Sequence, residues 1–402
     1  MIEAGSRAFW RATLALCLGS LMIFANVYVT QPLLPMIAES FGISPLQAGW
    51  SFTVTTLTLG LSLLFYGPLS DALGRRGIIL LSMGGAALTT LALSQADSYA
   101  MLLGLRALQG LFLGGLPAIA IAYMGDEFDR KALMLAVGFY ISGNTLGGVG
   151  GRLVGGFVGD SYGWSQAFLV MAIISVLLLG LVIWLLPASS GFSPRALRPR
   201  IMLRDLLGHL RNPLLLGAYL VGGLNFFIFI NQYSYATFML ADAPYGLSAK
   251  FLGMLFLTYL SGTLGSALSG RAAQKLPQPV CLMVGIVLLM LGSTVTLIPT
   301  LPAIVAGFLI NSFGFFFAHS TASSWVSRHA QQARASASSL YLLFYYLGAS
   351  AGGFYLAPFW HAYGWPGVIA ASLAVFCLTL WISFLLLRAE RRRPDATVHA
   401  TG

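Results

Sequence analysis

The chain has 402 residues, of which 57% are hydrophobic and only 8% are charged. Soluble domains carry about 25% charged residues, so this composition excludes an ordinary soluble protein. Mean hydropathy is +0.82, and apolar runs of about 20 residues recur, long enough to cross a bilayer as helices. Three scattered cysteines predict neither a disulfide framework nor a metal site. The composition predicts an all-α polytopic membrane protein.

Twelve apolar segments are predicted to span the membrane, with breaks at charged residues and at turns rich in proline or glycine. The ranges are 10–34, 46–66, 77–95, 100–124, 134–158, 164–186, 213–240, 246–270, 277–298, 301–325, 335–360 and 364–387. The first run exceeds the apolar core of a cleaved signal peptide, about 7–15 residues, and is predicted to be a retained span.

The formal charge of +10 is the excess of 22 lysines and arginines over 12 aspartates and glutamates. With a cytoplasmic N-terminus the lysines and arginines all fall in inside segments except Lys250 in an outer loop and Arg106 and Arg152 within spans. Basic residues collect in cytoplasmic loops. We therefore expect a protein of a bacterial inner membrane with both termini on the cytoplasmic side. The expected partner of its basic residues is membrane lipid and not nucleic acid.

A linker at 187–212 is predicted to separate a six-helix bundle at 1–186 from a second at 213–387, before a cytoplasmic tail at 388–402. In the linker, Leu203, Leu206, Leu207 and Leu210 share one helical face. This pattern fits a short amphipathic helix on the inner membrane surface, or an ordinary solvated linker.

The two bundles are predicted to be pseudo-symmetric repeats. The tripeptide YGW at 162–164 recurs at 363–365, an offset of 201. The same offset places Gly147 and Gly151 on Gly348 and Gly352. Duplicated six-span halves are a known transporter architecture.

The loop after the second span reads GPLSDALGRRG, residues 67–77. Gly67 would let two helices approach closely, and an Asp71–Arg75 pair four residues apart could form a charged latch, with Asp126 and Glu127 as further partners. The stretch resembles the loop motif of the major facilitator superfamily, Gly-x-Leu-Ala-Asp-Arg-x-Gly-Arg-Arg. The residues that match are Gly67, Leu69, Asp71, Gly74, Arg75 and Arg76, whereas Ala72 departs from the motif. The resemblance implies the fold of that family and a cytoplasmic gate; the alternative is a basic turn that only sets topology.

The fourth span contains RALQG at 106–110 and is similar to a second motif of the same family, matched by Leu102, Arg106, Gln109 and Gly110. An arginine inside a membrane helix normally faces a cavity or a partner. In proton-coupled members of the family this arginine is linked to proton transfer. The alternative is that Arg106 reaches outward to the membrane interface.

The fifth span resembles the exporter motif of the family, Gly-x8-Gly-x3-Gly-Pro-x2-Gly-Gly. Its matches are Gly138, Gly147, Gly151, Gly155 and Gly156, and Arg152 replaces the proline. The row formed by Gly143, Gly147, Gly151, Gly155 and Gly159 would let a second helix pack closely, and the resemblance implies that this helix belongs to the other half. Arg152 is a candidate gate or substrate contact, or it extends to the outer interface. The segment 26–44 also looks like the arabinose- and drug-efflux branch, and the resemblance favours export.

In this family, spans one, four, seven and ten line a central cavity. The polar and aromatic candidates there are Asn26, Tyr28, Gln31, Gln109, Asn225, Phe226, Asn231, Gln232, Tyr233, Asn311, Phe315 and His319. They suit an amphipathic or weakly cationic substrate. The alternative for each is hydrogen bonding between helices of the bundle.

All twelve aspartates and glutamates fall in loops, tails or span ends. The coupling candidates are therefore Arg106, His319, whose side chain ordinarily titrates near neutral pH, and the Asp71–Asp126 region. We expect a monomeric transporter, without a cofactor other than a proton gradient, that exports a small organic molecule by alternating access and proton antiport. An importer or passive facilitator of the same fold is the alternative. An intramembrane enzyme would need clustered catalytic groups, and a sensor or scaffold would need added domains.

Overall fold

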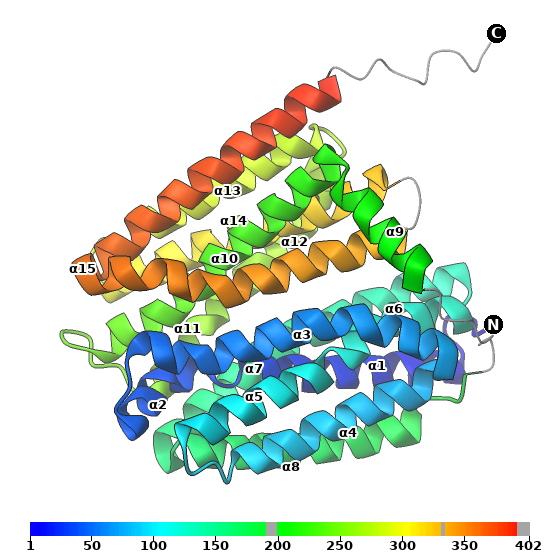
Figure 1. Cartoon of the computed structure of the whole chain (residues 1–402), viewed down its shortest axis with the longest axis horizontal. Coiled ribbons are helices and arrows are strands. Elements are labelled where there is room, and N and C mark those ends of the chain that lie inside the picture. Colours follow the sequence, from blue (N-terminus) through cyan, green and yellow to red (C-terminus); the bar gives the residue numbers. More distant parts are fainter. Residues whose placement is uncertain (190–198, 331–333, 392–402) are drawn as a thin grey trace. The chain divides into compact units, whose positions relative to one another are not determined.

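The computed structural model describes residues 1–189, 199–330 and 334–391 (Figure 1). In these ranges the regular structure is helical, apart from an isolated bridge between Ile2 and Phe128. Residues 190–198 of the predicted linker and the predicted tail from residue 392 onward lie outside the described residues.

The first half of the chain contributes six membrane-length segments. The first is α1 (Arg7–Tyr28), the 3₁₀ turn η1 (Gln31–Leu33) and α2 (Leu34–Phe41); the others are α3 (Pro45–Leu73), α4 (Arg75–Leu93), α5 (Tyr99–Leu113) with α6 (Gly115–Glu127), α7 (Arg130–Tyr162) and α8 (Trp164–Leu185). The second half holds α9 (Pro199–Leu210), α10 (Pro213–Ala241), α11 (Ala249–Leu255), η2 (Phe256–Thr258), α12 (Tyr259–Ala272), α13 (Gln278–Val295), α14 (Leu301–His329) and α15 (Arg334–Arg391).

Eleven continuous segments of the described chain are long and apolar enough to cross a membrane. The last of them, within α15, contains two predicted spans, because Gly364 interrupts it at φ 61° and ψ −145°. Figure 1 shows the chain turning back there, with the two arms in orange and red. The twelve predicted spans are thus all present in these eleven segments.

Local sequence signals fix several helix ends. Ser44 begins α3 with a capping box, in which its hydroxyl accepts from the Gln47 amide and the Gln47 side chain accepts from the Ser44 amide. Gly74 (φ 105°) separates α3 from α4, and Gly163 (φ 89°) separates α7 from α8. Both turns need a backbone conformation that glycine adopts without steric cost.

The first span is broken where the sequence predicted one continuous helix. The α-helix α1 ends at Tyr28, and the chain passes through the turn η1 before α2 begins at Leu34. Pro32 and Pro35 contribute to the break, because a proline nitrogen cannot donate the hydrogen bond that continues a helix. The carbonyls in the last turn of α1 therefore need partners from elsewhere.

The chain packs as two compact units. Unit 1 comprises residues 1–198 and 233–257, and unit 2 comprises residues 199–232 and 258–402. The last part of α10, α11 and the start of η2 thus pack with the first-half helices. The domain boundaries from the sequence, with residues 213–387 as one bundle, stay a prediction.

Basic residues gather at one end of unit 1. The Arg11 guanidinium donates to the Trp184 carbonyl at 2.9 Å, and Arg76 donates to the carbonyls of Ile183 and Leu186 at 3.1 and 3.0 Å. These bonds bring the start of α1 and the start of α4 to the end of α8, where they satisfy carbonyls that the helix leaves open. The sequence places the same residues on one side of the membrane.

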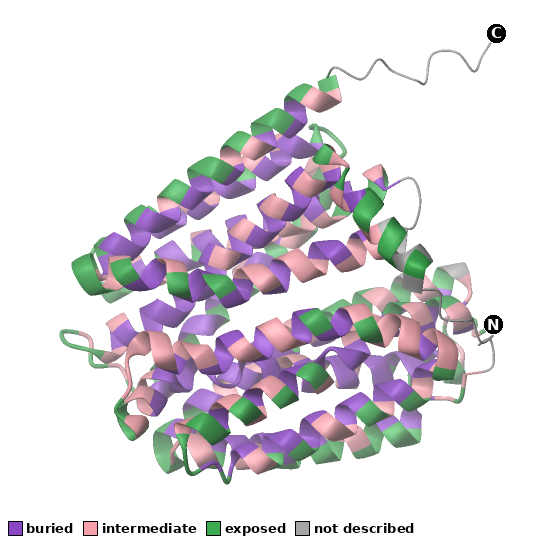
Figure 2. Ribbon diagram, viewed as in Figure 1, coloured by how far each residue is buried: buried purple, intermediate pink, exposed green. Residues whose placement is uncertain are grey.

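Exposed segments run along the helices in Figure 2, and many of the exposed residues are large and apolar. On α8, Ile173, Leu177 and Trp184 are 53%, 64% and 70% exposed. Such exposure is expected in a membrane, since lipid tails are as apolar as leucine. Polar side chains such as Asn26 and Arg106 are instead fully buried.

Candidate functional site

The glycine row of α7 packs against α1. A methyl group built on Gly143, Gly147, Gly151 or Gly155 would come within 3.0 Å of a backbone carbonyl of α1. These carbonyls belong to Cys17, Leu21 and Ala25 of α1 and to Val29, which directly follows its last residue. Small residues permit such backbone contact between membrane helices. The expectation of a partner from the other half is therefore wrong for this row, because the helix of closest approach belongs to the same half.

Unit 2 repeats this packing. Methyl groups on Gly348 and Gly352 of α15 would come within 3.0 Å of the carbonyls of Gly223 and Phe227 on α10. The glycines that the repeat offset relates therefore make equivalent contacts in both units.

The remaining glycines of the exporter motif divide into two cases. Gly156 lies on the neighbouring face of α7, where a methyl group would meet the Ala249 carbonyl at 2.6 Å and the Gly253 Cα at 3.1 Å. Gly156 thus packs against α11, a helix of the second half of the chain. At Gly138 a methyl group would meet no atom of the structure within 4 Å. Close packing explains the motif except at its first position.

Arg152 is fully buried in unit 1. Its Nε donates to Gln31 Oε1 at 2.8 Å and its Nη1 to the Gly148 carbonyl at 3.1 Å. The guanidinium carbon lies 4.0 Å from the ring centroid of Tyr28 and 4.3 Å from that of Phe256. Cation–π contacts of this kind gain strength when they are desolvated. The buried position argues against extension to the membrane interface.

Gln31 carries the contact onward. Its Nε2 donates to Ser234 Oγ on α10 at 3.2 Å, while its Oε1 accepts from Arg152. We call Arg152, Gln31, Tyr28, Ser234 and Phe256 the Arg152 link. It joins α7 and the broken first span to residues 233–257. Tyr233, a cavity candidate, stacks on Phe256 with centroids 5.2 Å apart.

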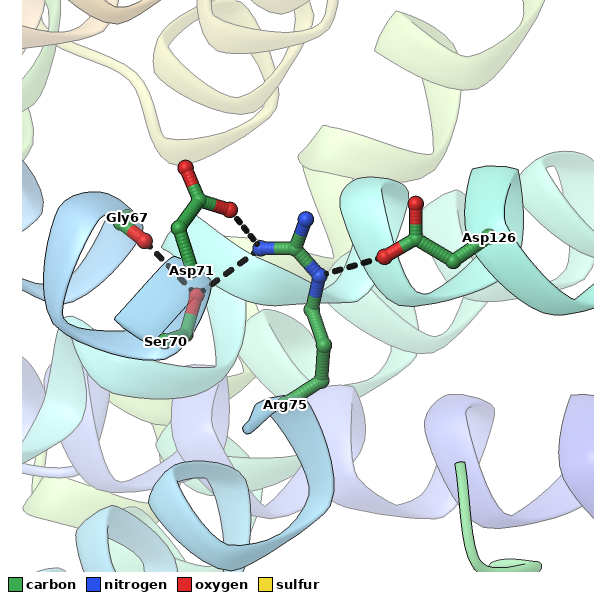
Figure 3. Close-up of polar contacts among 5 residues, drawn as sticks. All are labelled: Gly67, Ser70, Asp71, Arg75 and Asp126. Carbon is green, nitrogen blue, oxygen red and sulfur yellow. Dashed lines mark hydrogen bonds and ion pairs between the residues drawn. The ribbon is translucent and has the colours of Figure 1, made fainter. Parts of the chain in front are cut away.

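At the other end of α7, Arg75 is held by two carboxylates (Figure 3). Arg75 Nη1 lies 2.6 Å from Asp71 Oδ1, and Arg75 Nε lies 2.7 Å from Asp126 Oδ2. Arg75 Nη1 also donates to Ser70 Oγ at 2.9 Å, and Ser70 donates to the Gly67 carbonyl. The Arg75 side chain is 8% exposed, whereas the side chains of Asp71 and Asp126 are 38% and 29% exposed, so a buried cation meets two partly exposed carboxylates. We call Asp71, Arg75 and Asp126 the latch.

The other motif residues of this loop have separate tasks. Gly74 supplies the turn with positive φ, and Arg76 caps the end of α8. A methyl group at Gly67 would meet no atom of the structure within 4 Å, so the close helix approach expected there is absent from the described residues.

Arg106 lies wholly inside unit 1. Its Nη1 and Nη2 donate to the carbonyls of Asn26 and Val27, each at 3.1 Å, and its Nε donates to the Ser51 carbonyl at 3.1 Å. Its Nη1 also donates to Gln109 Oε1 at 2.5 Å. The first two carbonyls belong to the last turn of α1. Arg106 therefore caps the break in the first span.

The amides around Arg106 form a closed network. Asn26 Oδ1 accepts from Thr90 Oγ1 at 2.6 Å and from Gln109 Nε2 at 3.3 Å. Asn26 Nδ2 donates to Ser175 Oγ at 2.8 Å, and Gln109 Nε2 donates to Thr90 Oγ1 at 2.7 Å. Asn26 and Gln109 thus join α1, α4, α5 and α8. Their substrate role stays a prediction.

Unit 2 has a network of neutral groups. Asn311 Nδ2 donates to Ser293 Oγ at 2.9 Å and to Gln232 Oε1 at 3.2 Å, and Gln232 Nε2 donates to Ser293 Oγ at 3.1 Å. Asn225 Oδ1 accepts from Thr379 Oγ1 at 2.9 Å, and Asn231 Nδ2 donates to the Ala349 carbonyl at 2.9 Å. These four amides also hold helices together.

His319 lies beside an aromatic cluster of unit 2. Its Nδ1 is 2.8 Å from the Tyr341 hydroxyl, which also donates to the His319 carbonyl at 3.3 Å. The His319 ring is nearly parallel to that of Phe315, and Phe226 stacks on Tyr345 with centroids 3.6 Å apart. Phe226 and Phe315 are both buried.

Comparison with known proteins agrees with this geometry. The family model of the Major Facilitator Superfamily matches residues 16–353, which include the latch, Arg106 and the Arg152 link. The chain belongs to the Major Facilitator Superfamily. It is therefore a membrane transporter and not an enzyme, as the sequence predicted.

Two relatives match this superfamily member over almost its whole length. An uncharacterized MFS-type transporter of Bacillus subtilis (strain 168), YybF, is 35% identical over 394 residues, which cover 98% of this chain and 97% of that protein. The inner membrane transport protein YnfM of Escherichia coli (strain K12) is 36% identical over 388 residues, 96% of this chain and 93% of that protein.

A crystal structure shows the same fold. A bacterial homolog of the human lysosomal transporter Spinster, in an inward-facing and unoccupied conformation, superposes with a TM-score of 0.75. It covers 98% of this chain and 100% of that one at 18% sequence identity. The predicted all-α major facilitator fold is confirmed.

Sequence reasoning missed several partners of the site residues. Ser70 lies inside the loop motif and could have been found there, whereas Ser234, Phe256 and Tyr341 have no sequence signal. Their partners are 203 and 22 residues away for Ser234 and Tyr341, so only folding reveals the pairs. Within the described ranges, no group of three or more His, Cys, Asp or Glu residues could hold a metal ion.

Proposed function

We propose that this superfamily member exports a small organic molecule across a bacterial inner membrane by alternating access, in exchange for protons. It would work as a monomer with both termini in the cytoplasm. The observation that carries the proposal is a pair of polar links at opposite ends of unit 1, the latch and the Arg152 link. A transporter that alternates must be able to close either end of its pathway, and each link is made of contacts that can break as a set.

The separation of the two links follows from helix geometry. Asp126 and the start of α7 at Arg130 lie at the latch, and Arg152 follows 22 residues later along the same helix. At 1.5 Å per residue this is about 33 Å, close to the thickness of a bilayer core. The latch and the Arg152 link therefore belong to opposite sides of the membrane. The density of basic residues around the latch favours the cytoplasm for that side.

The composition of the Arg152 link supports a gate. Residues 233–257 belong to the second half of the sequence, yet they pack with the first-half helices through Ser234, Phe256 and Gly253. A rocking motion of one half against the other would have to separate these contacts. The link contains one cation, two aromatic rings, one amide and one hydroxyl, and these side chains come from elements that can separate and re-form their contacts as a set. Arg152 thus takes over a place where the exporter motif has proline.

The direction of transport rests on the glycine motif. Gly147, Gly151 and Gly155 sit at positions where any side chain would collide with α1, and Gly156 sits against α11. The motif therefore has a packing role in this chain beyond matching a pattern. Because exporters of the family carry this motif, its use at the α1–α7 and α7–α11 contacts supports export over import.

Coupling to protons is proposed to use His319 or the latch carboxylates. His319 is held by Tyr341, whose hydroxyl can donate to the neutral ring or accept from the protonated ring while turning its own proton to the His319 carbonyl. Both protonation states can thus keep a hydrogen bond. Arg106 donates hydrogen bonds to four oxygen atoms, and two of these oxygens lie at the break in the first span. These bonds favour a role for Arg106 in shaping the pathway over a role as the proton carrier.

The substrate is proposed to be amphipathic or weakly cationic. The candidate residues combine apolar and polar groups. The rings of Phe226 and Phe315 offer apolar faces, and the amides of Asn231 and Gln232 offer uncharged hydrogen-bonding groups. Sites of this composition bind ligands mainly through apolar contact and orient them with a few polar groups.

The test uses everted membrane vesicles energised with a proton gradient that acridine orange reports. Ethidium, tetraphenylphosphonium and a set of sugars and amino acids are added one by one. An exported substrate enters these vesicles, releases protons and raises the dye signal; an uncoupler abolishes the uptake. Vesicles with the Arg152→Ala or the Asp126→Asn variant each lack one of the two links. Comparing their substrate uptake with that of wild type shows whether that link is needed for transport.

The alternative is an importer or passive facilitator of the same fold. Uptake into everted vesicles that continues after the uncoupler would show a facilitator. Loss of substrate from preloaded everted vesicles on energisation would show an importer. Normal export by His319→Gln would exclude His319 as the obligatory proton carrier and leave the latch carboxylates.

A further inference from the structure

Helix α9 has one buried and one exposed face. His209 is 9% exposed, and α9 packs against α15 within unit 2. Leu203 and Leu207 are 57% and 43% exposed. Figure 2 shows the exposed face along this short helix. Two exposed leucines one turn apart form an apolar strip that unit 2 leaves uncovered.

Arginines flank this apolar strip. Arg200, Arg204 and Arg211 are all exposed. At 100° per residue, these three arginines and the two leucines fall within a sector of about 100°, opposite His209. The exposed face of α9 therefore combines aliphatic side chains with three positive charges.

The direction of α9 suits a helix that lies in a membrane plane. Figure 1 shows α9 running across the end of unit 2, with α10 and α15 extending away from it. At this end a methyl group built on Gly217, near the start of α10, would lie 3.1 Å from the Leu386 side chain near the end of α15. Arg388 and Arg391 are exposed just beyond Leu386. The membrane surface on this side is thus bordered by positive charge on two elements.

We propose that the exposed face of α9 binds anionic phospholipid. Leu203 and Leu207 enter the acyl-chain boundary, while Arg200, Arg204 and Arg211 hold the phosphates of the headgroups. Amphipathic helices of this pattern lie in the interface and prefer anionic lipid. The charge favours an anionic bilayer over a zwitterionic one, and the leucines favour a lipid surface over a soluble polyanion, which would leave them in water.

The experiment uses the purified full-length protein in detergent and titrates it with phosphatidylglycerol or phosphatidylcholine while native mass spectrometry counts bound lipid. Wild type should retain phosphatidylglycerol in preference. The triple variant Arg200→Gln, Arg204→Gln, Arg211→Gln should bind it about 100-fold more weakly, because each basic residue near an anionic surface contributes roughly fivefold. Leu203→Gln with Leu207→Gln should weaken both lipids.

The matched control is Arg271→Gln with Lys275→Gln, which removes two exposed positive charges, one in the last turn of α12 and one just after it. This control should bind phosphatidylglycerol with the same affinity as wild type. A triple variant that binds within twofold of wild type overturns the proposal, as does a control that loses as much. A wild-type dimer that the double leucine variant converts to monomer would assign the face to a second copy. Because binding is read without transport, these outcomes are independent of export and of proton coupling.

Discussion

The polar networks of the two units lie at related positions in the sequence, but one surrounds a cation and the other joins only neutral groups. In unit 1, Asn26, Thr90 and Gln109 surround the cation of Arg106. In unit 2, Gln232, Ser293 and Asn311 bond among themselves. Thr90 and Ser293 lie on α4 and α13, and Gln109 and Asn311 lie on α5 and α14, at offsets close to that of the repeated glycines.

The continuity of the neighbouring helix explains the difference. The first span breaks after Tyr28, so the carbonyls of Asn26 and Val27 lack partners within the helix, and Arg106 supplies them. Helix α10 runs unbroken from Pro213 to Ala241 and satisfies its own carbonyls. A buried cation is costly unless several oxygens receive it. Unit 1 therefore tolerates an arginine because the break provides the acceptors.

Arg106→Ala is the largest expected perturbation. It leaves the carbonyls of Asn26, Val27 and Ser51 and the Gln109 side chain without their donor. The loss of unfolding free energy should be about 3 kcal/mol or more, since each buried unsatisfied group costs about 1–3 kcal/mol. Thermal unfolding of the detergent-purified protein measures this, and transport should fall to background. Arg106→Lys should recover part of the stability but not all four bonds.

If Arg106→Ala unfolds at the temperature of wild type, the break in the first span does not depend on the guanidinium. The comparison between the units would then need another cause.

Gly151→Ala and Gly352→Ala should have the next largest effects, and similar ones. Each added methyl group would collide with a backbone carbonyl of the paired helix. Overpacking of this kind costs about 1–3 kcal/mol. The same thermal unfolding assay measures both variants.

Gly150→Ala is the matched control on α7, because a methyl group there meets no atom of the structure within 4 Å. Equal stability of Gly151→Ala and Gly150→Ala would show that the α1–α7 contact is looser than described.

Asn311→Ala should cost less than Arg106→Ala, about 1–2 kcal/mol, because it breaks neutral hydrogen bonds to Gln232 and Ser293. Asn311 Oδ1 already lacks a hydrogen-bond donor among the described residues, so no bond is lost on that side. Calorimetry of the purified variant gives the value. A cost as large as that of Arg106→Ala would remove the distinction between the charged and neutral networks.

Thr90→Val and Ser293→Ala should have the smallest effects, about 0.5–1.5 kcal/mol each. The Thr90 hydroxyl bridges the amides of Asn26 on α1 and Gln109 on α5. The Ser293 hydroxyl bridges the amides of Gln232 on α10 and Asn311 on α14. Matched thermal shifts would sharpen the equivalence of the two networks. A tenfold difference in transport between them, at equal stability, would instead place substrate or proton at one network only.

Much of the fold could be predicted from sequence because its signals are local. Ranges such as 164–186 and 213–240 agree with α8 and α10 to within a residue at each end, since apolar length and capping residues act over a few positions. The Asp71–Arg75 pair was predictable for the same reason, because its partners are four positions apart in the sequence. The broken first span was not foreseen, because an apolar stretch through Pro32 reads as continuous by hydropathy.

The partners of single residues were harder to foresee. The glycine row of α7 was visible as a period of four, yet its period says nothing about which helix it meets. Arg152 could be seen as a charge inside a span, but Gln31 lies 121 residues away in sequence. The same holds for Arg106, whose acceptors are backbone carbonyls that any residue could supply.

Composition and apolar length by themselves determined a polytopic helical protein and its twelve spans, because the bilayer imposes those constraints on every segment separately. The family was indicated by the resemblance of the motifs at 67–77 and 106–110. The tertiary structure alone decided that α7 packs its glycines on α1, that Arg106 caps the break in the first span, and that Arg152 lies between Tyr28 and Phe256. Each of these depends on how helices distant in sequence approach one another. Backbone contacts and buried hydrogen bonds stabilise one arrangement of helices over the others, and they form only when the helices are packed.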